Sequence, residues 1–348
     1  MVLRAPGEGG QRAPILWETH QDTVGVTGMK IDPFAATESR GRIWGRGACD
    51  VKGALAAMLA ALTRIQAAGV APPRTILLAF TINEECGFSG IKTLSRLWEN
   101  QPASPAEADP ATGPLSLDEI RALRPERAIV AEPTLLDVVV AHKGSLRWRC
   151  RTHGKAAHTS RPEQGINAIS TMVRVVQTIE QYQSEVLQYL DPHPLCGQPT
   201  VCVSTIQGGT GVNTVPDQAV IDIDRRLTPG ETPDQAYQEL VDYLAQHNED
   251  CVAAIEHQRP TNQSIGLQDD NNRGWAEQIA ATASSPGATS RLIGVPYGTD
   301  AWAVSQLGIP TVVFGPGSIE QAHTDDEWID IEQLERATEI FYRLALAG

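Results

Sequence analysis

Residues 13–23 read APILWETHQDT, an apolar run that ends in His20 and Asp22. Residues 13–20 have the length and composition of a buried strand, so the histidine stands at the end of the strand and the aspartate follows it. A single histidine at a strand end is more often structural than catalytic. The meaning of this pair therefore depends on whether other strands of the chain end in groups that can act with it.

Strands and helices alternate around this run. Residues 53–68 (GALAAMLAALTRIQAA) are strong helix formers, and Gly69 follows them as the residue that ends the helix. Further strands are predicted at 74–82, 127–131, 137–141 and 310–315, and further helices at 116–123, 272–284, 300–307 and 331–347. This order predicts an α/β fold with a mostly parallel sheet.

The middle of the chain has a different order of elements. Strands are predicted at 145–153, 200–208, 218–228 and 251–257, with helices at 165–190 and 232–248. The resulting order, β-α-β-β-α-β, is that of a ferredoxin-like domain. We therefore predict one domain formed by residues 1–144 and 258–348, and a second domain, formed by residues 145–257, that is inserted into it.

The composition excludes several classes of protein. The chain has 348 residues, a formal net charge of −14, 41% hydrophobic residues and 20% charged residues, which is typical of a soluble globular protein. The negative charge disfavours nucleic acid, and no apolar run reaches the roughly 18 residues that cross a membrane. The chain starts without the apolar segment of a signal peptide, and its six cysteines form no C-x-x-C pair. We therefore predict reduced thiols and a cytoplasmic location.

Acidic residues and a second histidine follow the predicted strands or their connections. These residues are Asp50 in GRGACDVKG (45–53), Glu84 and Glu85 after strand 74–82, Glu132 after strand 127–131, and His323 after strand 310–315. The carboxyl ends of parallel strands meet at one edge of a sheet, where ligands bind. Two imidazoles and several carboxylates suit zinc or a similar divalent ion. Their number exceeds the needs of one tetrahedral ion and fits two ions that share a bridging carboxylate.

Two neighbouring motifs predict roles beyond metal binding. Asp22 is placed to accept the second ring N–H of His20 and so to orient the ring. Glu84 and Glu85, as neighbours on an extended segment, would point in opposite directions. One could then bind a metal while the other takes a proton from the activated water. Taken alone, a Glu-Glu pair is usually only a solvated surface.

These motifs together resemble a family of di-zinc amidohydrolases and exopeptidases. That family includes acetylornithine deacetylase, succinyl-diaminopimelate desuccinylase, aminoacylase and glutamate carboxypeptidase. The resemblance extends over GKAAHTSRPEQGINAI (154–169), GGTGVNTVPD (208–217), DRRLTPGE (224–231), YGTDA (297–301) and GPGSIEQAHTDDE (315–327). The last two stretches are most similar to the acetylornithine deacetylase branch.

The resemblance implies a specific set of metal ligands. Asp50 would bridge two divalent metal ions, with zinc favoured and cobalt or manganese as alternatives. His20 and Glu132 would complete one site, and Glu85 and His323 the other. The resemblance also implies a cis peptide bond after Asp50.

The resemblance further implies that residues 1–144 and 258–348 form a catalytic, metal-binding domain and that residues 145–257 form a dimerisation domain. It also implies catalytic residues. Glu84 would be the general base and acid, and Asp22 would orient His20. His158, in the inserted domain, would reach the active site of a second subunit and stabilise the oxyanion, which requires a homodimer formed through that domain.

Four residues are implied to contact the substrate. Asn213 and Arg226 would hold its α-carboxylate, for which a guanidinium has a suitable geometry. Thr299 and Asp300 lie in a loop similar to the substrate loop of the family. Capping of the helix that follows them is the alternative interpretation.

We predict a metal-dependent hydrolase that cleaves the amide bond of N-acyl-L-amino acids, with an N-acetyl amino acid such as N-acetylornithine favoured and a role in arginine biosynthesis. The alternatives are a dipeptidase or carboxypeptidase, and an enzyme similar to succinyl-diaminopimelate desuccinylase. From other classes, a non-catalytic metal-stabilised binding protein and a cysteine hydrolase using Cys49 or Cys86 stay open as less favoured hypotheses.

Overall fold

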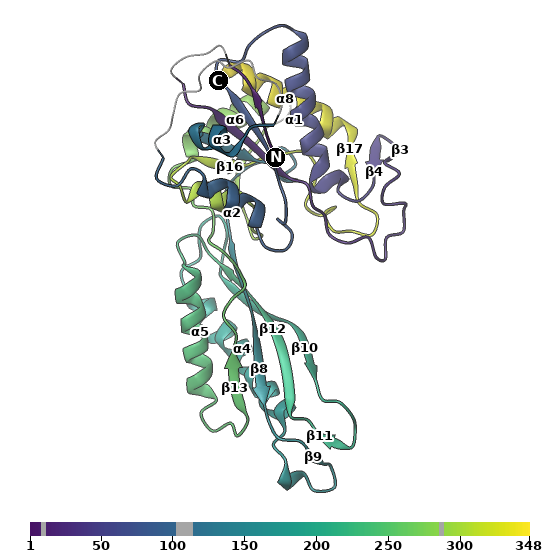
Figure 1. Ribbon diagram of the computed structural model, residues 1–348, viewed down its shortest axis with the longest axis vertical. Helices are drawn as coiled ribbons and strands as arrows, with labels where there is room; N and C mark the ends of the chain where they lie inside the picture. The colour runs from purple at the N-terminus through teal and green to yellow at the C-terminus, as the bar shows by residue number, and fades with distance from the viewer. Residues whose placement is uncertain (8–11, 102–113, 285–288) are drawn as a thin grey trace. The chain divides into compact units, whose positions relative to one another are not determined.

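The computed structural model describes residues 1–7, 12–101, 114–284 and 289–348. The chain forms two compact units, each with its own core (Figure 1). The main unit comprises Met1–Ala141, Gln268–Gly294 and Thr299–Gly348. The inserted unit comprises His142–Leu267 and Val295–Gly298.

The main unit is built on a sheet of seven strands. In spatial order these are β1 (Val2–Ala5), β5 (Ile76–Thr81), β2 (Ile15–His20), β6 (Arg127–Val130), β16 (Thr311–Val313), β7 (Val138–His142) and β15 (Leu292–Val295). The four strands from β5 to β16 are parallel, while β1 pairs with β5 and β7 pairs with β16 in antiparallel fashion. The predicted α/β class with a mostly parallel sheet is confirmed, whereas β1 and β15 were not predicted.

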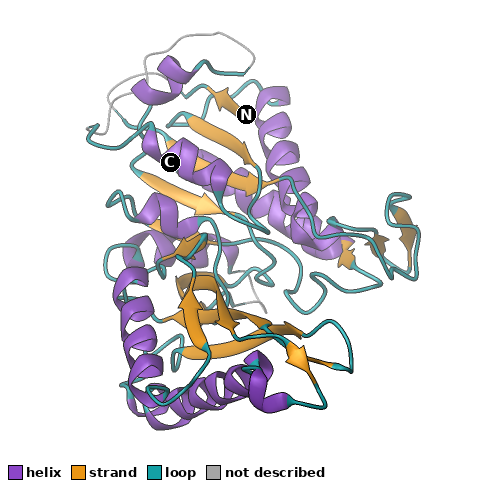
Figure 2. Cartoon of the chain, turned by 60° about the horizontal axis from the view of Figure 1, so that its bottom comes forward, coloured by secondary structure: helices purple, strands orange, loops and turns teal. Residues whose placement is uncertain are grey.

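Helices α1 (Gly53–Ala67), α6 (Arg273–Ala283) and α8 (Ile331–Ala347) share one core cluster with the sheet. Figure 2 shows helices lying beside the strands of the main unit. Trp17 of β2 packs against Phe341 of α8, with ring centroids 5.1 Å apart. Three shorter helices complete the main unit: α2 (Ser89–Arg96), α3 (Leu117–Ala122) and α7 (Ala301–Ser305). Ser116 begins α3 with a capping box to Glu119. Much of the rest of the stretch 101–125 lies outside the described residues.

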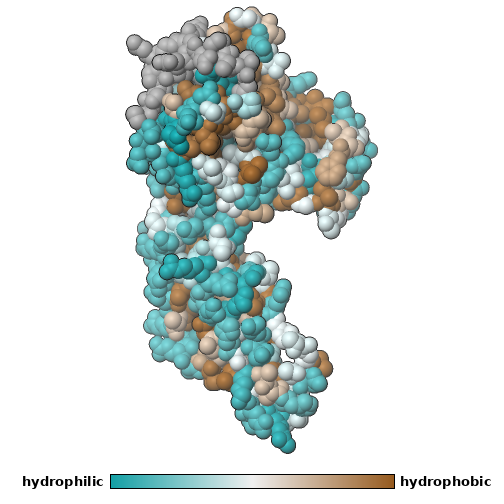
Figure 3. All heavy atoms as spheres, viewed as in Figure 1, coloured by the Kyte–Doolittle hydropathy of each residue, from teal (hydrophilic) through white to brown (hydrophobic). Residues whose placement is uncertain are grey.

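A small antiparallel sheet in the main unit was not predicted. It consists of β3 (Thr37–Ser39), β4 (Arg42–Trp44) and β17 (Trp328–Asp330). Trp44 and Trp328 lie opposite each other in the β4–β17 pair, with ring centroids 6.1 Å apart, and apolar side chains gather over this region (Figure 3). The pairing joins the segment before Asp50 to the segment after His323.

The inserted unit has the predicted β-α-β-β-α-β order. Its elements are β8 (Gly144–His153), α4 (Ala168–Glu185), β10 (Thr200–Gly208), β12 (Gln218–Leu227), α5 (Pro233–His247) and β13 (Ala254–His257). The sheet order is β10-β12-β8-β13, and β14 (Asn262–Ser264) also pairs with β8. Because β14 belongs to this sheet, the unit extends beyond residue 257, where the sequence predicted its end. The assignment of the two units to catalysis and dimerisation stays a prediction.

None of the helices in the described ranges is both long enough and apolar enough to cross a bilayer.

Candidate metal centre

The register of the parallel strands brings the predicted ligands to one edge of the sheet. His20, the last residue of β2, lies beside Thr81, the last residue of β5. Val130, the last residue of β6, lies beside Val313, the last residue of β16. The residues that follow these strands therefore leave the sheet at the same edge, as expected for the ligand side of an α/β fold.

Asp50 lies between the two predicted histidine ligands. Its Oδ1 is 3.1 Å from His20 Nε2, and its Oδ2 is 3.3 Å from His323 Nε2. Glu132 Oε1 lies 3.9 Å from His20 Nε2, and Glu85 Oε2 lies 3.0 Å from His323 Nε2. The two triples therefore share Asp50, and within each triple the ligand atoms lie within 4.8 Å of one another. The structure thus brings together all five predicted ligands.

The donor set fits divalent cations. It offers only imidazole nitrogens and carboxylate oxygens, the ligands that zinc and similar ions take. Glu85 Oε1 is buried and has no hydrogen-bond partner in the described part of the chain. His20, Asp50 and Glu132 are at most 6% exposed. Buried carboxylates need a cation or a proton as a counter-charge, and a metal ion at each triple would supply it.

Protons compete with metal ions for this site. Burial by itself lowers the pKa of His20, but the nearby carboxylates of Asp22 and Asp50 raise it well above its ordinary value. Hydrogen bonds to Asp50 and Glu85 raise the pKa of His323 to about 10. Burial raises the pKa of Glu132 well above its ordinary value, and the charge of Asp50 adds to this effect. Metal binding must therefore displace protons.

The loop that carries Asp50 has the predicted backbone. The peptide bond between Asp50 and Val51 is cis. Gly47 has a φ of 78°, in the left-handed region that glycine adopts without strain. The neighbouring Cys49 is fully buried, and burial raises the pKa of its thiol. A thiol in this environment is a poor nucleophile, which argues against a cysteine hydrolase using Cys49.

The Glu84–Glu85 pair lies on a turn, and the prediction of an extended segment was wrong. Asn83 has a φ of 65°, and its carbonyl oxygen accepts hydrogen bonds from Gly87 N and Phe88 N at 3.0 and 2.6 Å. The tight turn follows β5 directly and directs Glu85 to the metal triple. Glu84 belongs to neither triple, so the two glutamates still have different surroundings. Burial and the nearby charge of Asp300 raise the pKa of Glu84 well above its ordinary value.

Asp22 contacts His20 mainly through its backbone, which corrects the prediction that its carboxylate accepts the ring N–H. His20 Nδ1 lies 3.0 Å from the carbonyl oxygen of Asp22 and 3.7 Å from Oδ1. The carboxylate instead accepts the main-chain N–H groups of Glu84 and Glu85, each at 3.3 Å. Burial alone would raise the pKa of Asp22, but the nearby imidazole of His20 and, to a smaller extent, these main-chain N–H groups lower it to about 2. Asp22 therefore holds the glutamate turn beside His20.

A buried pair of carboxyl groups, Glu18 and Asp300, lies next to the centre and was not predicted. The hydroxyl of Thr81 contacts Glu18 Oε1 at 2.6 Å and Asp300 Oδ2 at 3.1 Å. One hydroxyl proton cannot serve two carboxylates. Burial raises the pKa of Glu18 to about 7 and that of Asp300 well above its ordinary value. The only signal in the sequence was a glutamate within an otherwise apolar strand.

The predicted substrate residues Thr299 and Asp300 are both buried, at 0% and 1% exposure. Thr299 Oγ1 accepts a hydrogen bond from Ala301 N at 3.2 Å, which is the capping interaction of the alternative interpretation. Asp300 makes no capping bond and contacts Thr81 instead. Their role in substrate binding stays a prediction.

The other three predicted residues lie in the inserted unit. His158 of β9 (Ala157–His158) pairs with Thr214 of β11 (Thr214–Val215), and Thr159 N donates to Asn213 O at 3.1 Å. Arg226 lies near the far end of β12, where it forms an ion pair with Asp224 at 2.8 Å.

Asn213 and Arg226 therefore cannot hold one carboxylate within a single chain. Arg226 lies eight positions further along β12 than Gln218, which is close to Asn213 in the chain. At about 3.4 Å per strand residue this distance is roughly 27 Å.

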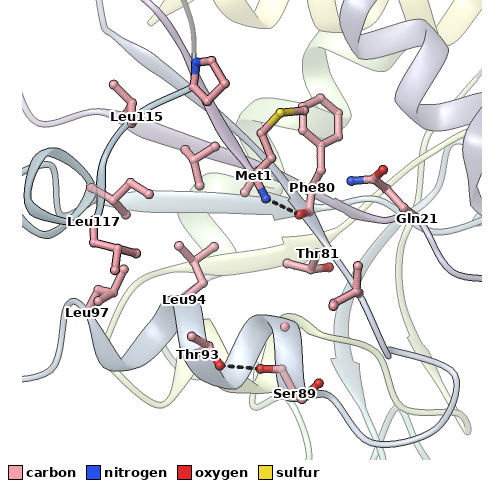
Figure 4. Close-up of a pocket in the computed structure, with 16 residues that line it drawn as sticks. Met1, Gln21, Phe80, Thr81, Ser89, Thr93, Leu94, Leu97, Leu115 and Leu117 are labelled. Atoms are coloured by element: carbon pink, nitrogen blue, oxygen red, sulfur yellow. Dashed lines mark hydrogen bonds between the residues drawn. The ribbon is translucent and has the colours of Figure 1, made fainter.

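A cavity of about 520 Å³ lies beside β1 and β5 (Figure 4). Its walls are largely apolar and include Leu94, Leu97 and Leu117, while the amino group of Met1 donates to Phe80 O at 2.9 Å. It is lined by none of the five predicted metal ligands. This cavity is therefore separate from the candidate metal centre, which lies at the ends of the parallel strands.

Comparisons with known proteins agree with this geometry. The family model described as Peptidase family M20/M25/M40 matches residues 16–347. Acetylornithine deacetylase from Myxococcus xanthus is 31% identical over 345 residues, which are 99% of this chain and 82% of the relative. Acetylornithine deacetylase from Proteus mirabilis is 30% identical over 333 residues, which are 93% of this chain and 77% of the relative.

Solved structures with low sequence identity share the fold. The M20 family metallo-carboxypeptidase Sso-CP2 from Sulfolobus solfataricus gives a TM-score of 0.75 at 18% identity, covering 100% of this chain and 88% of that one. The dipeptidase Dug1p from Saccharomyces cerevisiae gives a TM-score of 0.76 at 11% identity, covering 100% and 82%. These matches confirm the predicted fold class.

The α/β fold and the paired ligand triples define the class of metal-dependent amidohydrolases. Within this class, the chain belongs to peptidase family M20/M25/M40. The predicted family is therefore confirmed, and so is the prediction of an enzyme.

The Glu18–Asp300 pair predicts how pH affects the stability of the metal-free protein. The pKa of Glu18 is about 7 in the folded state against an ordinary value of 4.5, so the folded state binds this proton more tightly. Its stabilising effect is complete below pH 4.5 and is lost as the pH rises to 7. Glu18→Gln stays neutral at every pH and should abolish this loss, which is about 3 kcal/mol for a pKa that rises from 4.5 to about 7.

Urea unfolding between pH 4.5 and 8, with a chelator present, measures this difference. We expect Glu18→Gln to be more stable than the wild type at pH 8. If the free energy of unfolding of the two proteins changed with pH in the same way, Glu18 would be ionised over the whole range, which would contradict the prediction.

Proposed function

We propose that this enzyme is an N-acyl-L-amino acid deacetylase that favours N-acetyl amino acids such as N-acetylornithine. The observation that carries the proposal is the position of Asp50, whose two carboxylate oxygens face different ligand triples. The acetylornithine deacetylases that match 93–99% of the chain support the substrate class. A role in arginine biosynthesis in the cytoplasm follows from that substrate.

We assign two divalent ions, with zinc favoured, to the two triples. His20, Asp50 and Glu132 would hold one ion, and Asp50, Glu85 and His323 the other. When bound, the ions would lower the pKa of a water molecule and polarise the acyl carbonyl group.

Glu84 is our candidate for the general base and acid. It stands next to the ligand Glu85 but outside both triples, and Asp22 fixes the turn that carries it. Glu84 would take a proton from the attacking water and give it to the nitrogen of the leaving amine. A raised pKa suits this role, because a group that both accepts and releases a proton works best near the operating pH.

A homodimer would complete the active site. Asn213 and His158 lie close together, whereas Arg226 is too far along β12 to join them on one substrate. If all three act on the same molecule, His158 and Asn213 must come from a second copy of the chain. Nδ1 of His158 accepts a hydrogen bond from Ser160 N at 3.1 Å, which leaves Nε2 as the N–H that could stabilise an oxyanion.

Surface features of the inserted unit support such a dimer. β10 is the edge strand of its sheet. Exposed apolar side chains lie on this strand and on α4: Ile206 is 57% exposed, Val173 45% and Ile169 36%. An open strand edge beside apolar side chains is suited to pairing with another copy.

The proposed chemistry predicts that Glu84→Gln lowers kcat by about 10²- to 10⁴-fold, because the substitution removes the proton carrier. Zinc content should stay as in the wild type, since Glu84 is not a ligand. Release of free amine from acetylated amino acids and from dipeptides, with and without a chelator, measures the activity and separates a deacetylase from a peptidase. Unchanged turnover in the variant would rule out Glu84 as the base.

The dimer predicts that two inactive variants restore each other. His158→Ala and Glu84→Gln should each be nearly inactive alone. In a randomly re-associated equal mixture, half of the dimers contain one intact site, so about a quarter of the wild-type activity should return. The matched control is His153→Ala, an exposed histidine of the same unit, which should stay active. A mixture no more active than its components would contradict a shared site.

A further inference from the structure

The side chain of Glu327 is fully buried and accepts four hydrogen bonds from the loop that carries Asp50. Its Oε1 accepts the main-chain N–H groups of Cys49 and Asp50 at 2.8 and 3.0 Å. Its Oε2 accepts the main-chain N–H of Gly47 at 2.9 Å and Nη1 of Arg46 at 2.7 Å. Every contact in this cluster is therefore a donor facing a carboxylate.

The same cluster fixes the segment that carries His323. Arg46 Nη2 donates to Thr324 O at 3.1 Å, directly after the histidine. Gly45 N donates to the carbonyl oxygen of Glu327 at 3.0 Å. The Arg46–Glu327 ion pair thus joins two segments that are about 280 residues apart in the chain, and each segment supplies one metal ligand.

The energetics of this arrangement favour a single geometry. Arg46 is 8% exposed and Glu327 is 0% exposed, so their charges compensate each other away from water. Removing the carboxylate would leave three buried main-chain N–H groups and Nη1 of Arg46 without the acceptor that they have in the structure. Such groups are costly when unpaired, so the loop would move to find other partners. Any such movement displaces Asp50 from its position between the two histidines.

We infer that Glu327 is a positioning residue of the metal centre: through Arg46 and three main-chain N–H groups it sets the position of Asp50 relative to His323. This inference rests on the proposed binding of two metal ions. Glu327 touches neither a ligand side chain nor the reacting groups. It therefore acts through the loop, and its effect should appear in metal affinity before it appears in chemistry.

The test compares zinc affinity in the wild type and in Glu327→Gln by competition with a chromophoric chelator. Partners of this kind typically alter metal affinity by about 10- to 100-fold, and we expect a loss of that size for the more weakly held ion. The circular dichroism spectrum of the metal-free variant should match that of the wild type. The matched control is Asp330→Asn, which breaks the Arg42–Asp330 ion pair between the same two segments without touching the Asp50 loop. Its zinc affinity should equal that of the wild type.

A second measurement needs no variant, in case Glu327→Gln does not fold. The four bonds to Glu327 involve protein atoms only, so the amides of Gly47, Cys49 and Asp50 should resist hydrogen exchange in the wild type both with and without zinc. Free exchange of these amides would overturn the inference. Wild-type zinc affinity in a folded Glu327→Gln would also overturn it while leaving the proposed function intact. A wild type that binds no divalent ion would overturn both.

Discussion

The arrangement of the metal centre depends on the unfavourable free energy of placing several carboxylates close together in a buried region. Asp50, Glu85 and Glu132 converge on the imidazoles of His20 and His323. Carboxylates this close together cannot all be ionised without a counter-charge, and burial increases the penalty. The site must therefore hold either protons or cations, and the shared position of Asp50 fits two cations. The main-chain donors around Asp22 and Glu327 hold the loops that keep these charges together.

The convergence of the metal ligands could be predicted because it follows from the parallel direction of the strands in the sheet. Parallel strands end at a common edge, and the chain places an acid or a histidine after each of them. The positions of His20 and Glu132 could be predicted once the two strands that lead to them, and the direction of these strands, were recognised. The inserted unit was equally accessible, since alternating apolar residues on β8 and β12 mark strands with one buried face.

The parts that could not be predicted are contacts between distant segments and the backbone conformation of one turn. Nothing near Glu327 in the sequence indicates that its carboxylate receives the N–H groups of Cys49 and Asp50. The turn at Glu84 depends on the left-handed backbone of Asn83, which a pattern of apolar residues does not reveal. Glu18 was overlooked because a strand pattern records only that a position is buried, and its partner Asp300 lies far along the chain.

The shared role of Asp50 is the central claim, and metal stoichiometry tests it most directly. Equilibrium dialysis against zinc, followed by elemental analysis, gives the ions bound per chain in the wild type, His323→Ala and Asp50→Ala. We expect two ions in the wild type, one in His323→Ala and none held tightly in Asp50→Ala, because only Asp50 belongs to both triples. Two tightly bound ions in Asp50→Ala would contradict the account.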